Sequence, residues 1–329
     1  MTRFVMPDLP VVEVLGDLKA ALAGGPNAVL VAPPGAGKTT LVPLALLDAR
    51  WLEGSRIIVL EPRRLAARAA ARRMAELLGE KVGETVGYRM RLDTKVGPKT
   101  RIEVVTEGVF QRIITGDPEL SGIGAILFDE FHERSLDADF GLALALDVQE
   151  GLREDLRILV MSATLDGARV AELLGDAPVV ESEGRAYPVD IRYEERPGTE
   201  RAEHAVVRVV RKALAEETGS LLVFLPGQGE IRRVAEALDA RLPENVFLAP
   251  LYGMMDIADQ DHAIRPPGPG TRKIVLATAI AETSITIDGV RVVVDSGLAR
   301  RPVFDPGSGL TRLETGRVSQ AAATQRAGR

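Results

Sequence analysis

The sequence has no cysteine, only three histidines and a single tryptophan among its 329 residues. The lack of cysteine excludes disulfides, thiolate zinc sites and thiol nucleophiles, and it fits a reducing compartment. The N-terminus lacks a basic segment followed by an apolar core, so it does not resemble a signal peptide. No apolar run has the length that a membrane-spanning helix needs. We therefore expect a cytoplasmic protein that does not bind membranes.

Positive charge is also scarce, since the net charge is −6 and 27% of the residues are charged. Taken alone, this value argues mildly against a nucleic-acid-binding protein, because phosphate binding favours a positive potential. A basic channel can nevertheless lie inside an acidic protein. Arginine outnumbers lysine; a GC-rich genome is the simplest explanation, although arginine is also the better phosphate ligand. The charge therefore leaves nucleic-acid binding open.

Short apolar runs alternate with amphipathic segments along the whole chain, which predicts parallel sheets covered by helices on both faces. The expected strands of a first unit are 28–32, 56–61, 101–106, 125–129 and 157–162. Those of a second unit are 220–225, 245–250, 273–278 and 290–295, and the expected helices include 64–78, 136–150 and 229–240. Residues 177–200 contain prolines, glycines and mixed charge, and are expected to connect the units. We therefore predict two α/β domains, residues 1–182 and 183–329.

A glycine-rich segment, VLVAPPGAGKTTL at residues 29–41, follows the first expected strand and precedes a helix. It matches the phosphate-binding pattern G-x-x-x-x-G-K-[ST], except that Ala32 replaces the first glycine. The remaining glycines let backbone N–H groups turn towards phosphate oxygens, while the lysine adds charge and the threonine offers a hydroxyl to magnesium. A glycine-rich turn with an incidental lysine is the alternative. We predict a nucleotide site formed by Pro33, Pro34, Gly35, Ala36, Gly37, Lys38, Thr39 and Thr40.

The expected strand 125–129 runs into an acidic segment, DEFHERS, at residues 129–135. A metal site, an acid/base pair and an ordinary polar loop are three interpretations of this segment. The phosphate loop decides between them, because a phosphate-loop enzyme needs an acidic strand end that binds magnesium and positions water. We predict that Asp129 and Glu130 act at magnesium with Thr39, and that Glu130 also activates the attacking water.

The histidine of this segment, His132, has no second histidine or cysteine at ligand spacing, which argues against a metal-ligand role. A cap of the following helix by His132 and Glu133 is the structural alternative.

Beyond the phosphate loop, seven segments in a fixed order resemble the motifs of superfamily 2 helicases of the DEAH type, and they cover almost the whole chain. They are EPRRLAARAAARR (61–73), TEGVFQR (106–112), DEFHERS (129–135), MSATLD (161–166), LVFLPGQGEI (222–231), ATAIAETSITIDGV (277–290) and QRAGR (325–329). Each segment alone is modest support, but their common order leaves little room for chance.

The resemblance implies an α/β fold of two tandem RecA-like domains, each a mostly parallel sheet with helices on both faces, with ATP in the cleft between the domains. It implies an ATP-dependent helicase that uses Mg²⁺, moves along or unwinds single-stranded nucleic acid, with RNA expected, and acts as a monomer.

The resemblance also assigns roles to single residues. The implied catalytic residues are Glu130, His132, Gln325 and Arg329, and those that couple hydrolysis to movement are Ser162, Ala163 and Thr164. Arg73 is the implied contact of the nucleotide base. The implied contacts of the nucleic-acid backbone are Arg63, Arg64, Thr106, Gly108, Gly227, Thr278 and Thr283.

Three positions depart from the family pattern. Phe131 stands where most relatives have alanine, a replacement typical of one bacterial branch. Ala279 replaces the usual asparagine of the fifth motif. Relatives hold the nucleotide base between an arginine and a phenylalanine, and the second of these positions is Ile264 here. We therefore expect weak selectivity for the base.

The last thirty residues carry two further expectations. Residues 303–313 predict a hairpin around DPGSG; in relatives a hairpin here wedges against the nucleic acid, and a plain surface hairpin is the alternative. The family's sixth motif continues beyond Arg329, so we expect an incomplete second domain in which Arg329 is frayed and held by few contacts. Such a chain is expected to bind ATP but to hydrolyse it poorly. A DNA translocase or remodeller, and an ATP-gated RNA clamp without processive unwinding, are the alternative functions.

Overall fold

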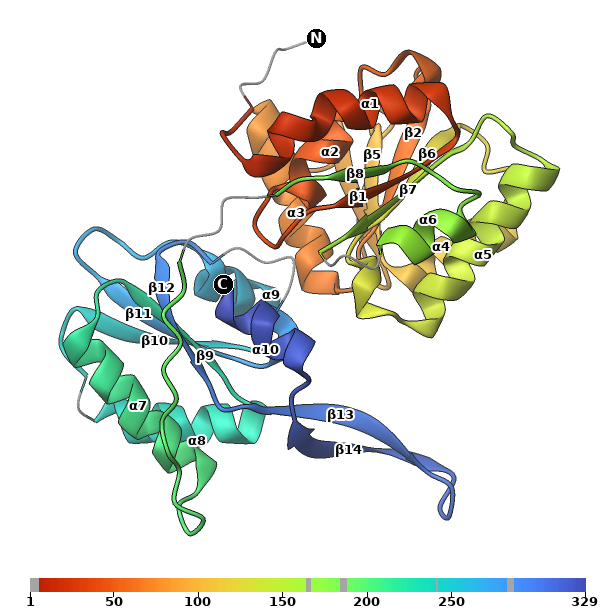
Figure 1. Cartoon of the computed structure of the whole chain (residues 1–329). Coiled ribbons are helices and arrows are strands. Elements are labelled where there is room, and N and C mark those ends of the chain that lie inside the picture. Colours follow the sequence, from red (N-terminus) through yellow and green to blue (C-terminus); the bar gives the residue numbers. More distant parts are fainter. Residues whose placement is uncertain (1–5, 164–166, 184–187, 241, 283–286) are drawn as a thin grey trace. The chain divides into compact units, whose positions relative to one another are not determined.

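The computed structural model describes residues 6–163, 167–183, 188–240, 242–282 and 287–329. The chain divides into two compact units, Met1–Ala186 and Tyr187–Arg329 (Figure 1). This division lies close to the predicted limit between residues 182 and 183. Within the described ranges, each helix is too short or not apolar enough to cross a membrane.

The first unit is built on an eight-stranded sheet in the order β4-β3-β5-β2-β6-β7-β1-β8. Its strands are β1 (Asn27–Val31), β2 (Arg56–Leu60), β3 (Val86–Met90), β4 (Asp93–Lys95), β5 (Ile102–Val105), β6 (Ile123–Phe128), β7 (Arg157–Ser162) and β8 (Val179–Glu181). Neighbouring strands are parallel except for β3 and β4, which pair antiparallel. The carboxyl ends of β1, β2, β6 and β7 therefore meet at one edge, where ligands bind in open parallel sheets.

Alternate residues of the central strands point to opposite faces of this sheet. In β2, Ile57 and Val59 join one apolar cluster, whereas Ile58 and Leu60 join the other. The helices of the first face are α1 (Leu15–Gly24), α2 (Lys38–Leu46) and α3 (Arg64–Leu78), and those of the second are α4 (Glu107–Gly116), α5 (Leu136–Gly151) and α6 (Gly167–Leu173). The predicted cover of helices on both faces is confirmed in this unit.

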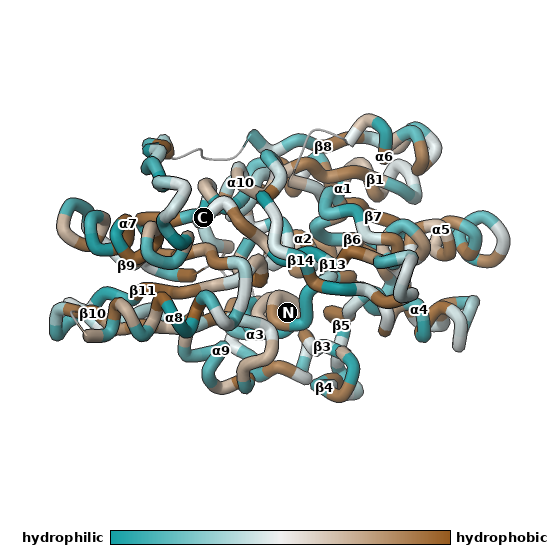
Figure 2. The backbone as a smooth tube through the Cα atoms, turned by 90° about the horizontal axis from the view of Figure 1, so that it is seen from below, coloured by the Kyte–Doolittle hydropathy of each residue, from teal (hydrophilic) through white to brown (hydrophobic). Residues whose placement is uncertain are grey.

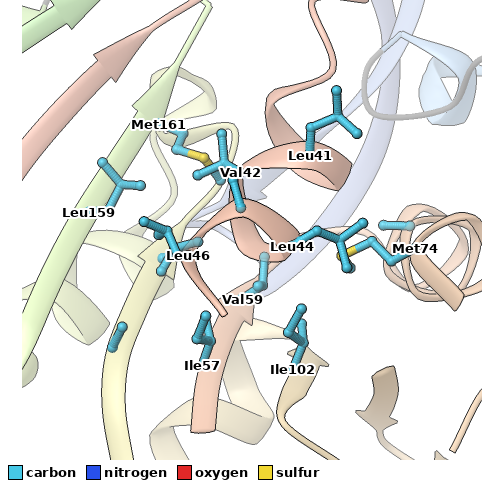
Figure 3. Packing of buried hydrophobic residues seen from close by; sticks show 14 of the residues in the cluster. Leu41, Val42, Leu44, Leu46, Ile57, Val59, Met74, Ile102, Leu159 and Met161 are labelled. Atoms are coloured by element: carbon cyan, nitrogen blue, oxygen red, sulfur yellow. The ribbon is translucent and has the colours of Figure 1, made fainter. Parts of the chain in front are cut away.

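Helix α2, which follows the phosphate loop, is anchored by its apolar side chains. Figure 3 shows Leu44 and Leu46 of α2 beside Ile57 and Val59 of β2 in the first-face cluster. Both leucines are almost fully buried. Burying a leucine side chain stabilises a fold by about 1.5–3 kcal/mol, so this packing fixes the helix whose first turn carries Lys38.

The second unit contains a four-stranded parallel sheet in the order β10-β11-β9-β12. Its strands are β9 (Ser220–Phe224), β10 (Val246–Leu251), β11 (Arg272–Ala277) and β12 (Val290–Asp295). Helices α7 (Ala202–Glu216) and α8 (Gln228–Asp239) bury apolar side chains on one face, with Val223 and Leu225. Figure 2 shows the hydrophobic colour concentrated along strands such as β11, whereas α7 alternates between polar and apolar residues.

Two shorter helices complete this unit. They are α9 (Ile257–Ile264), which packs beside β10, and α10 (Gln320–Ala327), which packs beside β12. Arg326 of α10 lies over the ring of Phe224, which points away from Val223 and Leu225 because side chains alternate along a strand. Helix α10 therefore covers the face opposite α7 and α8, and the second sheet also has helices on both faces. Short 3₁₀ helices elsewhere are η1 (Pro10–Val14), η2 (Arg50–Leu52), η3 (Phe131–Glu133) and η4 (Ala279–Ala281).

The predicted hairpin is confirmed, and it is longer than expected. Strands β13 (Leu298–Asp305) and β14 (Leu310–Arg317) pair antiparallel, with Asp305 opposite Leu310. In the turn, the Asp305 carboxylate accepts hydrogen bonds from the Gly307 N–H at 3.0 Å and the Ser308 hydroxyl at 2.7 Å. These bonds explain why DPGSG turns the chain.

The predicted strands and helices are confirmed, with ends that shift by about one or two residues. Three strands were not predicted: β3, in which glycine and arginine interrupt the apolar run, β4 and β8, which have three residues each. The interpretation of 177–200 as a connection is wrong at its start, because β8 lies there and pairs with β1. Short edge strands carry too little periodicity to be recognised from sequence.

Candidate active site

The phosphate loop connects β1 to α2 and turns through two glycines in the left-handed region. Gly35 has φ +78° and Gly37 has φ +89°, a conformation that other residues disfavour. A Cβ atom on Gly37 would also lie 2.7 Å from Leu9 Cδ1. Gly37 is the N-cap of α2 and has no side chain to accept from the first N–H groups. Those groups therefore suit an anion such as phosphate.

The rest of the loop is tied to neighbouring backbone. Ala32, at the position of the missing glycine, is buried and donates its N–H to the Ser162 carbonyl at 2.9 Å. Ala36 accepts from the Val11 N–H at 3.1 Å. The Thr40 hydroxyl donates to the Gly37 carbonyl at 3.4 Å. Pro33 and Pro34 are half-buried at the start of the turn, which ends at Gly37, and Lys38, Thr39 and Thr40 form the first residues of α2.

Lys38 is buried in the first turn of α2 and reaches the acidic end of β6. Its Nζ lies 3.2 Å from Oε1 of Glu130, and both side chains are at most 5% exposed. Burial by itself lowers the pKa of Lys38, but the negative charges of Glu130, Asp129 and Glu61 outweigh it and raise the pKa above its ordinary value. The lysine is therefore held as a cation beside the phosphate loop.

Asp129 is buried directly after β6, next to Lys38. Its Oδ1 accepts from the Glu130 N–H at 2.9 Å, whereas Oδ2 is buried without a hydrogen-bond partner among the described residues. Burial and the Glu130 charge raise the pKa of Asp129 to about 6, against the lowering effects of Lys38 and the Thr39 hydroxyl. An unpaired buried oxygen costs about 1–3 kcal/mol, so this atom suits a ligand.

Magnesium fits this donor set. The Asp129 carboxylate and the Thr39 hydroxyl are hard oxygen donors, and Mg²⁺ at phosphate sites is commonly held by one or two protein oxygens plus phosphates. The described residues contain no cluster of three His, Cys, Asp or Glu side chains that could hold a metal alone. A metal at this site would therefore depend on the nucleotide for further ligands.

Glu130 and His132 are brought together at the start of η3. Glu130 has φ +50°, and its Oε2 lies 3.5 Å from His132 Nε2. His132 Nδ1 accepts from the Ala163 N–H at 3.1 Å, so this nitrogen carries no proton and Nε2 carries the ring hydrogen. Burial lowers the pKa of His132 despite the Glu130 charge. The neutral imidazole therefore links the acidic segment to the residue after Ser162.

Capping of α5 by His132 and Glu133, the structural alternative, is wrong. The N-cap of α5 is Ser135, whose hydroxyl oxygen accepts from the Ala138 N–H at 2.9 Å. His132 therefore does not cap α5, and its Nε2 lies near the Glu130 carboxylate instead.

Glu61, at the end of β2, was missed by the sequence analysis. It is fully buried; Oε1 accepts from the Arg63 N–H at 3.3 Å, and Oε2 has no hydrogen-bond partner among the described residues. Burial, followed by the charges of Asp129, Glu130 and Glu133, raises the pKa of Glu61 well above its ordinary value. The available signal was the same as for Asp129, an apolar strand that ends in an acid.

The predicted nucleic-acid contacts of the first unit lie on two helix starts. Arg63 pairs with Glu133, with Nη2 to Oε1 at 3.2 Å. Arg64 is exposed and donates to the Arg91 carbonyl at 3.2 Å. Thr106 is the N-cap of α4, and Gly108 is exposed in its first turn. Arg63 is thus tied to the acidic segment, whereas Gly108 lies at the surface.

Those of the second unit lie at the carboxyl ends of β9 and β11. Gly227 is the buried N-cap of α8, where a Cβ atom would come within 2.7 Å of Arg300. Thr278 follows β11 and donates its N–H to the Leu251 carbonyl at 3.2 Å. Thr283, like Thr164 of the predicted coupling segment, lies outside the described residues.

The predicted catalytic residues of the second unit lie on or just beyond α10. Gln325 is half-buried on the helix. Arg329 donates to the Glu282 carbonyl through Nε at 2.7 Å and through Nη2. The prediction that Arg329 is held by few contacts is therefore wrong, because two nitrogens of its guanidinium donate to one carbonyl. The sequence alone does not show that these two residues lie together.

A second residue missed from sequence is Arg326, whose side chain is 1% exposed. Its Nη2 lies 2.5 Å from Glu282 Oε1, and its Nη1 lies 2.7 Å from Asp295 Oδ1. Nη1 also donates to the Leu298 carbonyl at 3.3 Å, and the guanidinium lies 4.8 Å from the Phe224 ring centre. Arg326 therefore joins α10 to the fifth-motif segment, the end of β12 and the start of the hairpin.

The predicted base-binding residue, Arg73, is exposed on α3. It pairs with Glu76 at 3.6 Å, one turn further along the helix. Ile264 ends α9 in the other unit and is half-buried. Base binding by Arg73 and weak base selectivity stay predictions.

Comparison with known protein families gives two matches that together span most of the chain. Residues 18–173 match the DEAD/DEAH box helicase family, and residues 199–329 match the helicase conserved C-terminal domain. The limits of these matches fall within the two compact units.

Comparison with individual proteins gives the same picture. The chain is 58% identical over 324 residues to the ATP-dependent RNA helicase HrpB of Escherichia coli, covering 98% of this chain and 40% of that protein. It is 39% identical over 331 residues to the pre-mRNA-splicing factor ATP-dependent RNA helicase prp22 of Schizosaccharomyces pombe, covering 98% of this chain and 28% of that protein. The chain thus spans less than half the length of these relatives.

Solved structures extend the comparison to the fold. A crystal structure of the Escherichia coli DEAH/RHA helicase HrpB matches with a TM-score of 0.92 and 57% identity, over 98% of this chain and 41% of that chain. A crystal structure of the Escherichia coli DExH-box NTPase HrpB matches with a TM-score of 0.83 and 57% identity, over 99% of this chain and 40% of that chain.

Proposed function

The chain belongs to the DEAD/DEAH box helicases, and from this premise we propose that it hydrolyses ATP with Mg²⁺ and uses the hydrolysis to move along or unwind RNA. It contains a DEAD/DEAH box helicase domain followed by a helicase C-terminal domain. The relatives named above are ATP-dependent RNA helicases, which supports RNA over DNA as the polymer.

A single arrangement carries the proposal: the Lys38–Glu130 pair beside the unpaired Oδ2 of Asp129, at the N-terminus of α2. A structural ion pair needs no unsatisfied carboxylate next to it, since such an atom is costly when buried. A site for a phosphate–metal complex needs all three features: a cation for phosphate, an acid for the metal and an acid for water. The buried charges at this strand edge therefore favour nucleotide hydrolysis.

In this mechanism, Lys38 and the first N–H groups of α2 bind the terminal phosphates. Thr39 and Asp129 would hold the metal, which would supply charge neutralisation at the phosphate oxygens. Glu130 accepts the proton of the attacking water, and its second oxygen is oriented by the neutral imidazole of His132. The sequence also predicted a role of Glu130 at the metal. The variant Glu130→Gln tests this role together with the role of Glu130 as a base.

His132 gives the site a link to the next motif. Because its Nδ1 accepts from the Ala163 N–H, a change at Glu130 reaches the segment of Ser162 and Ala163 through one side chain. We infer that Ser162, Ala163 and Thr164 couple hydrolysis to movement through this contact. Gln325 and Arg329 of the second unit are proposed to act on the attacking water and on the charge of the transferred phosphoryl group.

RNA is proposed to bind through its backbone at Arg63, Arg64, Thr106 and Gly108 in the first unit and at Gly227, Thr278 and Thr283 in the second. Phosphate contacts position a polymer without reading its sequence. Affinity for single-stranded RNA is therefore expected to be tolerant of sequence, and its logarithm should fall with the logarithm of salt by about 0.7 per contacted phosphate.

Two alternatives remain from the sequence: a DNA translocase or remodeller, and an ATP-gated RNA clamp. The contact of Glu130 with Lys38 favours a hydrolase over a clamp, because a clamp needs ATP binding but no general base. A monomeric state, a cytoplasmic location and slow turnover by the present chain stay predictions.

The deciding experiment measures steady-state ATP turnover with poly-RNA, with poly-DNA and without polymer, at low and moderate salt. We expect RNA to raise turnover about tenfold, within the usual range of coupling between two ligands, and to do so less at higher salt. Equal stimulation by DNA would identify the translocase, and RNA binding that requires ATP, with turnover that neither polymer changes, would identify the clamp.

A further inference from the structure

Three phenylalanine rings form a column that connects α4 to the acidic segment of the active site. Phe110 on α4 meets Phe128, the last residue of β6, with ring centres 5.9 Å apart and planes at 83°. Phe128 meets Phe131 in η3 at 6.2 Å and 84°. All three side chains are at most 3% exposed. Edge-to-face contacts of this kind stabilise aromatic pairs beyond their burial.

The column ends between the two residues of the proposed hydrolytic pair. Phe131 is the residue between Glu130 and His132 in the chain, and Phe128 directly precedes Asp129. A shift of either ring therefore displaces backbone that carries a carboxylate of the site.

The turn that holds Phe131 is strained at both ends. Glu130 has φ +50° and Arg134 has φ +49°, a region that side chains other than glycine rarely adopt and that persists only where the surroundings fix it. Phe131 is the buried apolar side chain of this turn, and the Arg134 guanidinium lies 5.6 Å from its ring centre. The ring is therefore placed to fix the conformation of Glu130.

The other end of the column belongs to a helix with a proposed RNA contact. Thr106 is the N-cap of α4 and Gly108 lies in its first turn. The start of α4 is tied to the same segment a second time, because the Ser135 hydroxyl donates to Glu107 Oε1 at 2.6 Å. An alanine at position 131 would have no ring and would lose the edge-to-face contact with Phe128 at 6.2 Å.

We propose that Phe131 is a positioning residue that makes the RNA-stimulated step of ATP hydrolysis depend on α4, through the column Phe110–Phe128–Phe131. This inference rests on the proposed RNA-stimulated ATPase activity. RNA bound at the start of α4 shifts the helix, the three rings transmit the shift, and Glu130 and His132 change their position relative to water.

The test compares turnover with and without saturating poly-RNA in the full-length protein and its Phe131→Leu variant, which keeps an apolar side chain in the core. We expect the stimulation ratio, RNA-stimulated turnover divided by basal turnover, to fall about five- to tenfold, while RNA affinity changes by less than about twofold. Phe110→Leu should reproduce this loss of stimulation. The double variant should lose no more stimulation than either single variant, because each substitution already interrupts the contacts of the column.

The matched control is Leu156→Ala, a fully buried residue of the same apolar cluster that directly precedes β7. It should lower the melting temperature without changing the stimulation ratio. An unchanged ratio in Phe131→Leu, a loss that Leu156→Ala shares, or losses that multiply in the double variant would each overturn the role of the column. A wild-type protein that RNA does not stimulate would instead overturn the proposed function, and the column with it.

Discussion

The two units each bury a cluster of charges, and the clusters are satisfied in different ways. In the first unit, the ammonium of Lys38 contacts Glu130, and Glu61 and Asp129 each keep one oxygen without a hydrogen-bond partner among the described residues. In the second, the guanidinium of Arg326 contacts two carboxylates, a carbonyl and an aromatic ring. The second cluster thus pairs its cation with both acids, whereas in the first the cation contacts one acid among several.

This difference teaches how to separate a reactive site from a structural one when both are buried and charged. Burial and proximity are common to both clusters, so neither property identifies function. Hydrogen-bonding capacity does not separate them either, because Arg326 Nη2 is also buried without a hydrogen-bond partner among the described residues. Direct pairing of opposite charges does, since Arg326 contacts both of its carboxylates whereas Lys38 contacts Glu130, and a buried charge without a counter-charge is costly. The comparison therefore predicts loss of chemistry from changes in the first cluster and loss of stability from changes in the second.

The largest expected effect is on catalysis in the first cluster. Glu130→Gln keeps the shape of the side chain but removes the base, so kcat should fall by about 10²–10⁴ while ATP affinity is retained. Lys38→Ala removes the cation that binds phosphate and should lose both affinity and turnover. Nucleotide titration and steady-state turnover of the two variants measure this split. If Glu130→Gln lost affinity as severely as Lys38→Ala while folded, the assignment of the base would be wrong.

The next effect is on the stability of the second cluster. Arg326→Met leaves Glu282 and Asp295 close together without their cation, and breaking a buried pair in this way costs about 3–5 kcal/mol. Hydrogen exchange of the β9 and β12 amides in urea reports the unfolding of this unit. Arg192→Met is the control, since Arg192 pairs with Asp190 at 2.8 Å on the exposed surface and its loss should be undetectable. Equal exchange in the two variants would show that the Arg326 cluster is not a structural element.

The smallest effect sharpens the comparison through pH. Because burial raises the pKa of Asp129 to about 6, above its unfolded value of about 3.9, the folded state binds more protons between these values. Stability then falls as pH rises through this window. Without nucleotide and metal, Asp129→Asn should raise the free energy of unfolding by about 1–3 kcal/mol at pH 7.5, and the gain should vanish near pH 4. Urea unfolding across this range is the measurement, and a gain independent of pH would contradict the raised pKa.

Much of the fold could be predicted because its signals are local. The mostly parallel sheets with helices on both faces, expected from alternating apolar runs, are confirmed, and so is the fold of two RecA-like domains that the resemblance implied. The phosphate loop was recognisable because its glycines and lysine lie within one turn. The short strands β4 and β8 were not, because three residues carry no periodicity that separates a strand from a loop.

The sequence by itself determined which residues follow which strand: Lys38 after β1 and Asp129 and Glu130 after β6. Patterns within a few residues decide such placements, since secondary structure depends mainly on neighbours along the chain. Only the tertiary structure decided that Glu61 joins Asp129, that His132 accepts from Ala163, and that Arg326 closes on Glu282 and Asp295. These contacts join segments far apart in sequence, and they form because the strand order of each sheet brings the carboxyl ends of distant strands to one edge.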